Sequence, residues 1–257
     1  MKQRPSFPAR LGPKAEGLKV GVVRAVPANG VAGVPSPQGL GMDSAAHRQR
    51  LVQLLQKQGV RDNAVLTAMG SVERHRFVDS ALVNQAYEDT SLPIGLGQTI
   101  SKPGVVSRMI ELLLNGKTGK LGRVLEIGTG CGYQAAVLSL LAEEVYSIER
   151  LRGLHDKARE NLRHFRLPNV HLLFGDGMVG FAKGAPYAAI IAAAGGEALP
   201  QAWVDQLAVG GRLVAPVVRD GSQGGAQALL VLDKTSVGVR QTLLEVVHFV
   251  PLKSGVA

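Results

Sequence analysis

The sequence holds few aromatic residues, one cysteine and no long apolar run. Cys131 is the single cysteine among 257 residues, which excludes a disulfide within the chain and fits a reducing cytoplasm. Aromatic residues make up 4% of the chain, so aliphatic side chains must fill the core, and an apolar content of 46% is enough for this. No apolar run approaches the roughly 18 residues of a membrane span. We therefore expect a cytoplasmic protein that does not enter a membrane.

Two common catalytic patterns are also missing. The six histidines form no H-x-H or H-E-x-x-H arrangement and no set with the cysteine, so we expect no metal site. A G-x-S-x-G sequence, which presents the nucleophilic serine of many hydrolases, is absent as well. The chemistry of this chain must therefore come from other residues.

The positive charge is concentrated at the N-terminus. The net charge is +9, and the six basic residues and one acidic residue of residues 1–42 account for +5 of it, which leaves +4 for the rest. No run of lysine and arginine is interleaved with aromatic residues, as an RNA-binding face would require. We therefore expect no specific binding of nucleic acid.

The distribution of proline and glycine divides the chain into two parts. Residues 1–42 are rich in both and show no sustained apolar period, which predicts a flexible basic tail. Its most apolar stretch, Leu18 to Val26, is interrupted by Arg24 and followed by Pro27, so a signal peptide is not expected. Residues 43–257 have the size and pattern of a single α/β domain.

A strand, a glycine-rich turn and a helix follow one another from Arg123 onward. Val124 to Ile127 is a short apolar strand that ends in an acid-x-G-x-G-x-G pattern, formed by Glu126, Gly128, Gly130 and Gly132. The dinucleotide fingerprint would place a third glycine at position 133, where this chain has tyrosine. A carboxylate beside the turn would repel a pyrophosphate and suits a cationic ligand such as S-adenosylmethionine. The stretch resembles motif I of the class I methyltransferases, although glycines required only for backbone angles would give the same pattern.

The remaining pattern predicts a doubly wound, mostly parallel, Rossmann-like sheet with added N-terminal helices. Seven continuous apolar residues, 188–194, favour a buried strand, and a buried helix remains open. The segment Ser91 to Pro103 is expected to be a loop, and Gly210-Gly211 to turn the chain into a strand. The last two strands are expected to form an antiparallel pair. Predicted strands besides 124–127 are 145–148, 170–174, 188–194, 213–217, 229–233 and 243–249, and predicted helices are 43–59, from 62 or 63 through 69, 103–115, 151–165 and 199–207.

Acidic residues end two further strands of the predicted sheet. Glu149 lies about 20 residues after the glycine turn, where this fold places a carboxylate on the ribose hydroxyls. Asp176 and Gly177 follow the next strand. Because the carboxyl ends of neighbouring parallel strands face one crevice, we expect both positions to contact the cofactor. Two other interpretations remain, a favourable charge at a helix N-terminus for Glu149 and an Asx-Gly turn for Asp176.

Five segments together resemble the protein-L-isoaspartate O-methyltransferases from about Ala45 to the C-terminus. They are Thr99–Pro103, Val124–Gln134, Ser147–Arg150, Gly175–Gly177 and Phe249–Leu252. The resemblance implies methyl transfer from S-adenosylmethionine to isoaspartyl residues of damaged proteins, a protein-repair activity. It also implies that residues 43–103 form helices and a substrate loop and that 104–257 form the cofactor-binding sheet.

The loop Thr99-Ile100-Ser101 carries the catalytic expectation. By resemblance Ser101 is the catalytic residue, and Thr99 and Ile100 bind substrate. Without the resemblance, the Ser101 hydroxyl would be interpreted as a cap of the helix that begins at Pro103. Alternatives for the whole chain are a methyltransferase acting on RNA or a small molecule, and a cofactor-binding protein without catalysis.

The sequence departs from the family pattern at three places. Gly104 follows the loop proline, Ala188 replaces an aspartate before the fourth strand, and Gly195-Gly196 replace a turn that ends in proline. Whether Gly104 and Ala188 reduce activity is left open by the sequence, as are the peptide preference and the role of the tail. A monomer is favoured.

Overall fold

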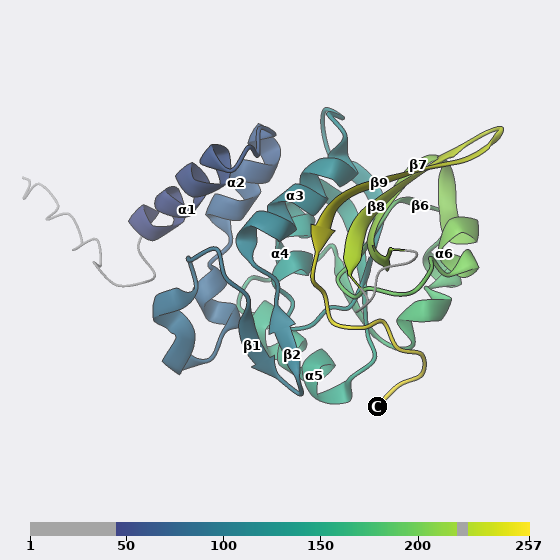
Figure 1. The fold of residues 1–257 in the computed structure, drawn as a ribbon. Helices are drawn as coiled ribbons and strands as arrows, with labels where there is room; N and C mark the ends of the chain where they lie inside the picture. Colours follow the sequence, from purple (N-terminus) through teal and green to yellow (C-terminus); the bar gives the residue numbers. More distant parts are fainter. Residues whose placement is uncertain (1–44, 220–225) are drawn as a thin grey trace, which may run out of the picture. The chain divides into compact units, whose positions relative to one another are not determined.

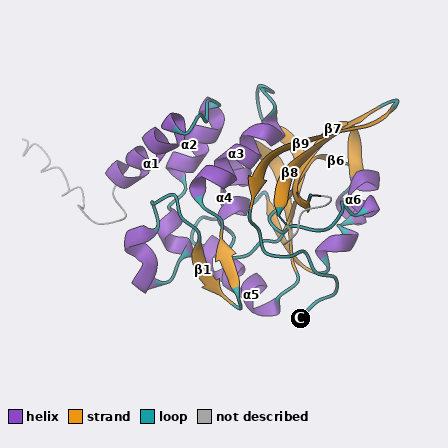
Figure 2. Ribbon diagram, in the orientation of Figure 1, coloured by secondary structure: helices purple, strands orange, loops and turns teal. Residues whose placement is uncertain are grey.

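The computed structural model describes residues 45–219 and 226–257, which all lie in one compact unit, Gly39–Ala257. The expected tail, residues 1–42, and the first two residues of the helix expected over 43–59 lie outside these ranges. Within them, helices flank a central sheet (Figure 1, Figure 2). The helices are α1 Ala45–Lys57, α2 Asn63–Ser71, η1 Arg74–Phe77, η2 Ser80–Gln85, α3 Pro103–Leu114, α4 Tyr133–Leu141, α5 Arg152–Arg163, η3 Gly177–Val179, η4 Ala182–Gly184 and α6 Gln201–Gln206.

The central sheet has seven strands in the order β5-β4-β3-β6-β7-β8-β9. Strands β5, β4, β3, β6 and β7 run parallel, and β8 and β9 continue the sheet as antiparallel strands. This confirms the expected doubly wound sheet with an antiparallel C-terminal pair. The strands are β1 Leu92–Gly95, β2 Gln98–Ile100, β3 Leu121–Ile127, β4 Ala142–Glu149, β5 Val170–Phe174, β6 Tyr187–Ala192, β7 Leu207–Val218, β8 Gln227–Thr235 and β9 Gly238–Val247.

The strand order reverses at β3, which pairs with β4 on one side and β6 on the other. Val124 is paired with both Val145 and Ala189, so three carboxyl strand ends lie next to one another. Ligands of open α/β sheets bind in the crevice at such a switch point. The topology therefore places the ligand site where β3 leads into the glycine turn.

Two apolar clusters cover the two faces of the sheet. One cluster contains side chains of α1 to α5, and thus includes the N-terminal helices. The other contains Trp203 of α6 and Tyr187 of β6. Residues 189–192 of β6 have no exposed surface, as expected for a parallel strand covered on both faces. A strand was the favoured interpretation of this apolar run, and it is confirmed against the alternative of a buried helix.

The N-terminal helices follow their sequence pattern. Leu51 and Leu55 of α1 are buried, as are Val65 and Met69 of α2. The Asp62 side chain caps α2, because its Oδ1 accepts hydrogen bonds from the amides of Ala64 (2.9 Å) and Val65 (3.1 Å). No helix of the described ranges is long and apolar enough to cross a membrane.

The expectation of a loop over residues 91–103 is wrong for residues 92–100, which form the antiparallel hairpin β1–β2. Leu92 and Ile94 are buried on one face, and Pro93 between them is exposed. This is the alternation of a half-buried strand, and proline is tolerated in it because β1 lies at the edge of a two-stranded sheet. The hairpin lies beside α5 (Figure 1), where Lys157 Nζ donates to the carbonyl of Ile94 at 3.1 Å.

The glycine pair 210–211 lies inside β7 rather than before it, so the expected boundary is wrong. Tyr187 pairs with Leu207, and Ala189 pairs with Arg212, which leaves residues 208–211 as an irregularity between the two pairs. Gly210 has a φ of 82° within this irregularity. The glycines therefore accommodate a bulge in a strand that begins earlier than the sequence pattern indicates.

Candidate active site

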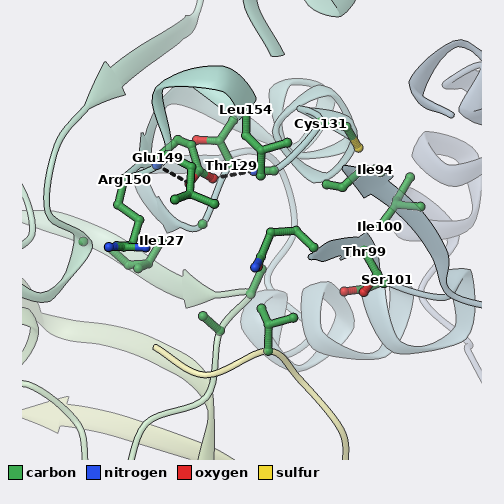
Figure 3. Close-up of a pocket in the computed structure, with 18 of the residues that line it drawn as sticks. Ile94, Thr99, Ile100, Ser101, Ile127, Thr129, Cys131, Glu149, Arg150 and Leu154 are labelled. Carbon is green, nitrogen blue, oxygen red and sulfur yellow. Dashed lines mark hydrogen bonds between the residues drawn. The ribbon is translucent and has the colours of Figure 1, made fainter. Parts of the chain in front are cut away.

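A cavity of about 450 Å³ opens at the carboxyl ends of β3 and β4. The hairpin β1–β2 lies on one side of it and the segment 250–253 on another (Figure 3). Seven of the ten residues expected at the site line this cavity, namely Thr99, Ile100, Ser101, Gly128, Gly130, Glu149 and Gly177. Glu126, Gly132 and Asp176 do not line it.

The glycine turn is held against the end of β4. The amides of Gly128 and Thr129 both donate to the carbonyl of Ile148, at 2.9 and 3.2 Å. Gly132 ends the turn as the N-cap of α4 with a φ of 92°, and a Cβ there would lie 3.0 Å from Leu162 Cδ1. Backbone conformation and packing against α5 therefore both favour glycine at this position.

Glu149 reaches the cavity from the end of β4. Its Oε2 accepts the amide hydrogen of Gly130 at 2.9 Å, and its Oε1 accepts that of Leu151 at 2.9 Å (Figure 3). The residue is 5% exposed. The carboxylate thus joins the glycine turn to the chain entering α5, and each oxygen keeps a lone pair for a further donor. Both the ribose interpretation and the helix-end interpretation fit this position.

Glu126 lies behind the turn and is fully buried. Ser147 Oγ donates to its Oε2 and is itself 2.6 Å from Thr129 Oγ1, so a short chain of hydroxyls leads from the carboxyl to the cavity wall. Burial raises the pKa of the Glu126 carboxyl to about 8. At neutral pH this carboxyl is mostly protonated, and the expectation that its charge attracts a cationic ligand is therefore corrected.

The raised pKa of Glu126 makes stability depend on pH. Between the ordinary carboxyl pKa of 4.5 and the folded value of about 8, the unfolded chain releases a proton that the folded chain keeps. The free energy of unfolding should therefore fall as pH rises through this window, by at most about 1.4 kcal/mol per pH unit. Glu126→Gln should flatten that fall in urea unfolding curves measured at pH 5, 6.5 and 8. An unchanged pH profile in the variant would contradict this assignment.

Both carboxylate oxygens of Asp176 accept hydrogen bonds from backbone amides. Its Oδ1 accepts from the amide of Met178 at 2.8 Å and its Oδ2 from that of Gly255 at 2.6 Å. These bonds cap the short helix η3 and fasten the C-terminal segment, so the turn interpretation of Asp176 fits its geometry. Its neighbour Gly177 does line the cavity, and a Cβ there would lie 2.6 Å from Ile127 Cγ2.

The C-terminal segment contributes residues that the sequence pattern did not place at the site. Val250 to Lys253 line the cavity. The Gly195 amide donates to the carbonyl of Val250 (2.9 Å), and the amide of Leu252 donates to the carbonyl of Gly195 (2.8 Å). The turn after β6 therefore holds this segment in place. In the sequence, this segment was marked only by the motif Phe249–Leu252. That motif contributed to the family resemblance, but it did not predict a position in the cavity wall.

Cys131 lines the same cavity, and its thiol is protonated at neutral pH. Burial raises the pKa of its thiol to about 11, so the thiolate is not formed. Within the described residues, no group of three or more histidine, cysteine, aspartate or glutamate side chains could hold a metal ion.

Ser101 lies where two cavities meet. It lines the first cavity and also a second one of about 970 Å³, which runs between the start of α3 and the end of β9. Figure 3 shows Ser101 beside Thr99 at the cavity edge. Its hydroxyl forms no hydrogen bond with any residue of the described ranges, and the N-cap of α3 is Lys102, without a side-chain capping bond. Helix capping therefore does not account for Ser101.

Comparison with known proteins gives a consistent result. The family model described as "Protein-L-isoaspartate(D-aspartate) O-methyltransferase (PCMT)" matches residues 46–257. A protein-L-isoaspartate O-methyltransferase of Methylibium petroleiphilum is 60% identical over 222 residues, which cover 86% of this chain and 82% of that protein. One of Leptothrix cholodnii is 60% identical over 219 residues, covering 84% and 77%. A solved structure with the same name has a TM-score of 0.72 at 27% identity and covers 81% of this chain and 67% of that one.

Proposed function

Because the chain belongs to the protein-L-isoaspartate O-methyltransferase family, we propose that it methylates the α-carboxylate of L-isoaspartyl residues in damaged proteins. The methyl transfer would take place beside Ser101, where the two cavities of the enzyme meet. The observation that carries this assignment is the position of Ser101 in the walls of both cavities. One cavity can hold the methyl donor while the acceptor carboxylate enters through the other. The reacting groups would then meet beside the Ser101 hydroxyl, which no residue of the described ranges engages in a hydrogen bond.

The first cavity fits the cofactor of this family, S-adenosylmethionine. Its volume of about 450 Å³ lies in the usual range of small-molecule sites. Gly128 and Gly130 would bring backbone close to the ligand, Glu149 would accept hydrogen bonds from ribose hydroxyls, and Gly177 would complete the wall. When bound, the cofactor supplies an activated methyl group on a sulfonium sulfur.

The acceptor needs little chemical assistance from the protein. A carboxylate with an ordinary pKa of about 4 is already ionised at neutral pH, so no general base is required. The protein must orient the carboxylate oxygen and exclude water, and orientation of this kind is worth roughly 7–11 kcal/mol. The Ser101 hydroxyl would donate a hydrogen bond that directs the carboxylate. A neutral donor achieves this without lowering the nucleophilicity of the oxygen as much as a cation would.

The methyl ester then leads to repair. It contains a better leaving group than the free acid, and attack by the following backbone nitrogen expels methanol and closes a succinimide. This step needs no further residue of the enzyme. The protein's own contribution ends when the ester is released.

The proposal extends to the setting of the enzyme. We place it in the cytoplasm as a monomer that acts on isoaspartyl-containing proteins and peptides and binds no specific nucleic acid. The single cysteine supports the cytoplasmic setting, and the absence of a basic run interleaved with aromatic residues supports the lack of specific nucleic-acid binding.

The test is a methylation assay with labelled cofactor on an isoaspartyl peptide beside its normal-aspartyl twin. We expect base-labile methyl ester on the isoaspartyl peptide alone. Label on RNA in place of the peptide would favour a different acceptor. Cofactor binding in a calorimeter without turnover on any isoaspartyl peptide would favour a binding protein without catalysis.

A further inference from the structure

Helix α3, which begins two residues after Ser101, has no cap of its own. Its N-cap residue, Lys102, makes no capping bond with its side chain, and Pro103 at the first helical position has no amide hydrogen. The Gly104 amide is therefore the first donor that the helix must satisfy. If this amide were unpaired, the start of the helix would be free to fray, and Ser101 lies only two residues before that start.

Asp89 supplies the missing cap from outside the helix. Its Oδ1 accepts the Gly104 amide hydrogen at 2.6 Å, and its Oδ2 accepts from Gln58 Nε2 at 2.9 Å. Lys102 Nζ lies 4.0 Å from the same Oδ2. The Asp89 side chain is 17% exposed, and its bond to the Gly104 amide is partly buried, whereas its bond to Gln58 is exposed. The carboxylate thus ties the end of α1 to the start of α3.

Gly104 makes this close approach possible. A Cβ at this position would lie 2.8 Å from Gln58 Oε1 and 2.9 and 3.0 Å from the two carboxylate oxygens of Asp89. Such contacts would force the Asp89–Gln58 pair away from the helix. The absence of a side chain at 104 therefore has a local structural reason in this protein.

The chain on both sides of Ser101 is then held. Ile100 pairs with Leu92 in the hairpin, which holds the residue before Ser101. Pro103 restricts the backbone after it, and the bond to Asp89 follows one residue later. Asp89 performs the capping, and among residues 45–219 and 226–257 the Ser101 hydroxyl has no hydrogen-bond partner at the junction of the two cavities.

We propose that Asp89 is a positioning residue for the methyl transfer, which caps α3 in place of Ser101 and so holds the Ser101 hydroxyl where the acceptor carboxylate arrives. This inference rests on the proposed function of Ser101. It assigns Asp89 no contact with the reacting atoms. Its effect on rate passes through Ser101.

The experiment compares two capping carboxylates. Asp89→Ala should lower kcat at saturating peptide by about tenfold or more, because displacement of a reacting group by about 1 Å costs on the order of a hundredfold. The dissociation constant of the cofactor product should change by less than about twofold, since Asp89 does not line the first cavity. Asp89→Asn keeps an acceptor for the Gly104 amide and should recover most of the rate. The matched control is Asp62→Ala, which removes the cap of α2 and should lower the melting temperature but leave kcat per folded molecule unchanged.

A double-mutant cycle tests the route through Ser101. In the Ser101→Ala background, Asp89→Ala should cost little further rate, because the group that it positions is gone. An equal loss in both backgrounds would overturn the proposal, as would wild-type kcat in Asp89→Ala.

Hydrogen exchange of residues 99–106 supplies a readout that does not depend on activity. Faster exchange in Asp89→Ala than in wild type is expected, and unchanged exchange would refute the capping role. A wild-type enzyme that forms no ester on isoaspartyl peptide would instead refute the proposed function, while the exchange result would still decide whether Asp89 orders this segment.

Discussion

Ser101→Ala is expected to lower kcat by about a hundredfold or more while the melting temperature and the cofactor dissociation constant stay close to wild type. The hydroxyl forms no hydrogen bond within the described residues, so its loss leaves no protein group unpaired. Its effect should therefore appear only when the acceptor carboxylate is present. Loss of alignment by about 1 Å can cost on the order of a hundredfold in rate. The measurement is an initial rate, a cofactor titration and a melting curve on one sample.

Two further serine variants sharpen this result. Ser101→Thr keeps the hydroxyl and adds a methyl group at the junction, and it should retain stability yet recover little rate. Ser107 on the same helix is the matched control, because its buried hydroxyl donates within the helix to the carbonyls of Pro103 (2.9 Å) and Gly104 (3.1 Å). Ser107→Ala should leave kcat per folded molecule unchanged. Near-normal turnover in Ser101→Ala would remove this residue from the mechanism.

Glu149→Ala is expected to weaken cofactor binding by about 10- to 150-fold, as hydrogen bonds to a charged group contribute about 1.5–3 kcal/mol. The carboxylate lies in the cavity wall and already accepts from Gly130 and Leu151, so its removal also releases the glycine turn. Isothermal titration with S-adenosylhomocysteine measures the loss directly. Saturating cofactor should restore much of the turnover.

The control for Glu149 lies on the same strand. Glu144 is partly exposed, pairs with Arg123 at 2.8 Å and does not line the cavity. Glu144→Ala should leave the cofactor dissociation constant unchanged. An unchanged constant in Glu149→Ala as well would show that Glu149 acts only as a charge at the start of α5.

Local pattern was a good guide to the sheet and to most of the cavity. Apolar runs predicted the strands, because a parallel strand covered on both faces must be apolar throughout. The hairpin at 92–100 was missed, because its glycines and proline outweighed a short alternation of buried Leu92 and Ile94. The C-terminal contribution was missed because backbone pairing between Gly195 and Val250 leaves no periodic signal.

The sequence by itself determined the strand, glycine turn and helix from Val124 to Leu141, since these depend on residues next to one another in the chain. It also determined that acidic and hydroxyl side chains would stand at strand ends and at the start of α3. Only the tertiary structure decided the protonation of these side chains and their hydrogen-bond partners. Burial, which depends on distant segments, makes the Glu126 carboxyl mostly neutral. Asp89 caps the helix after Ser101 because folding brings together groups that the chain separates.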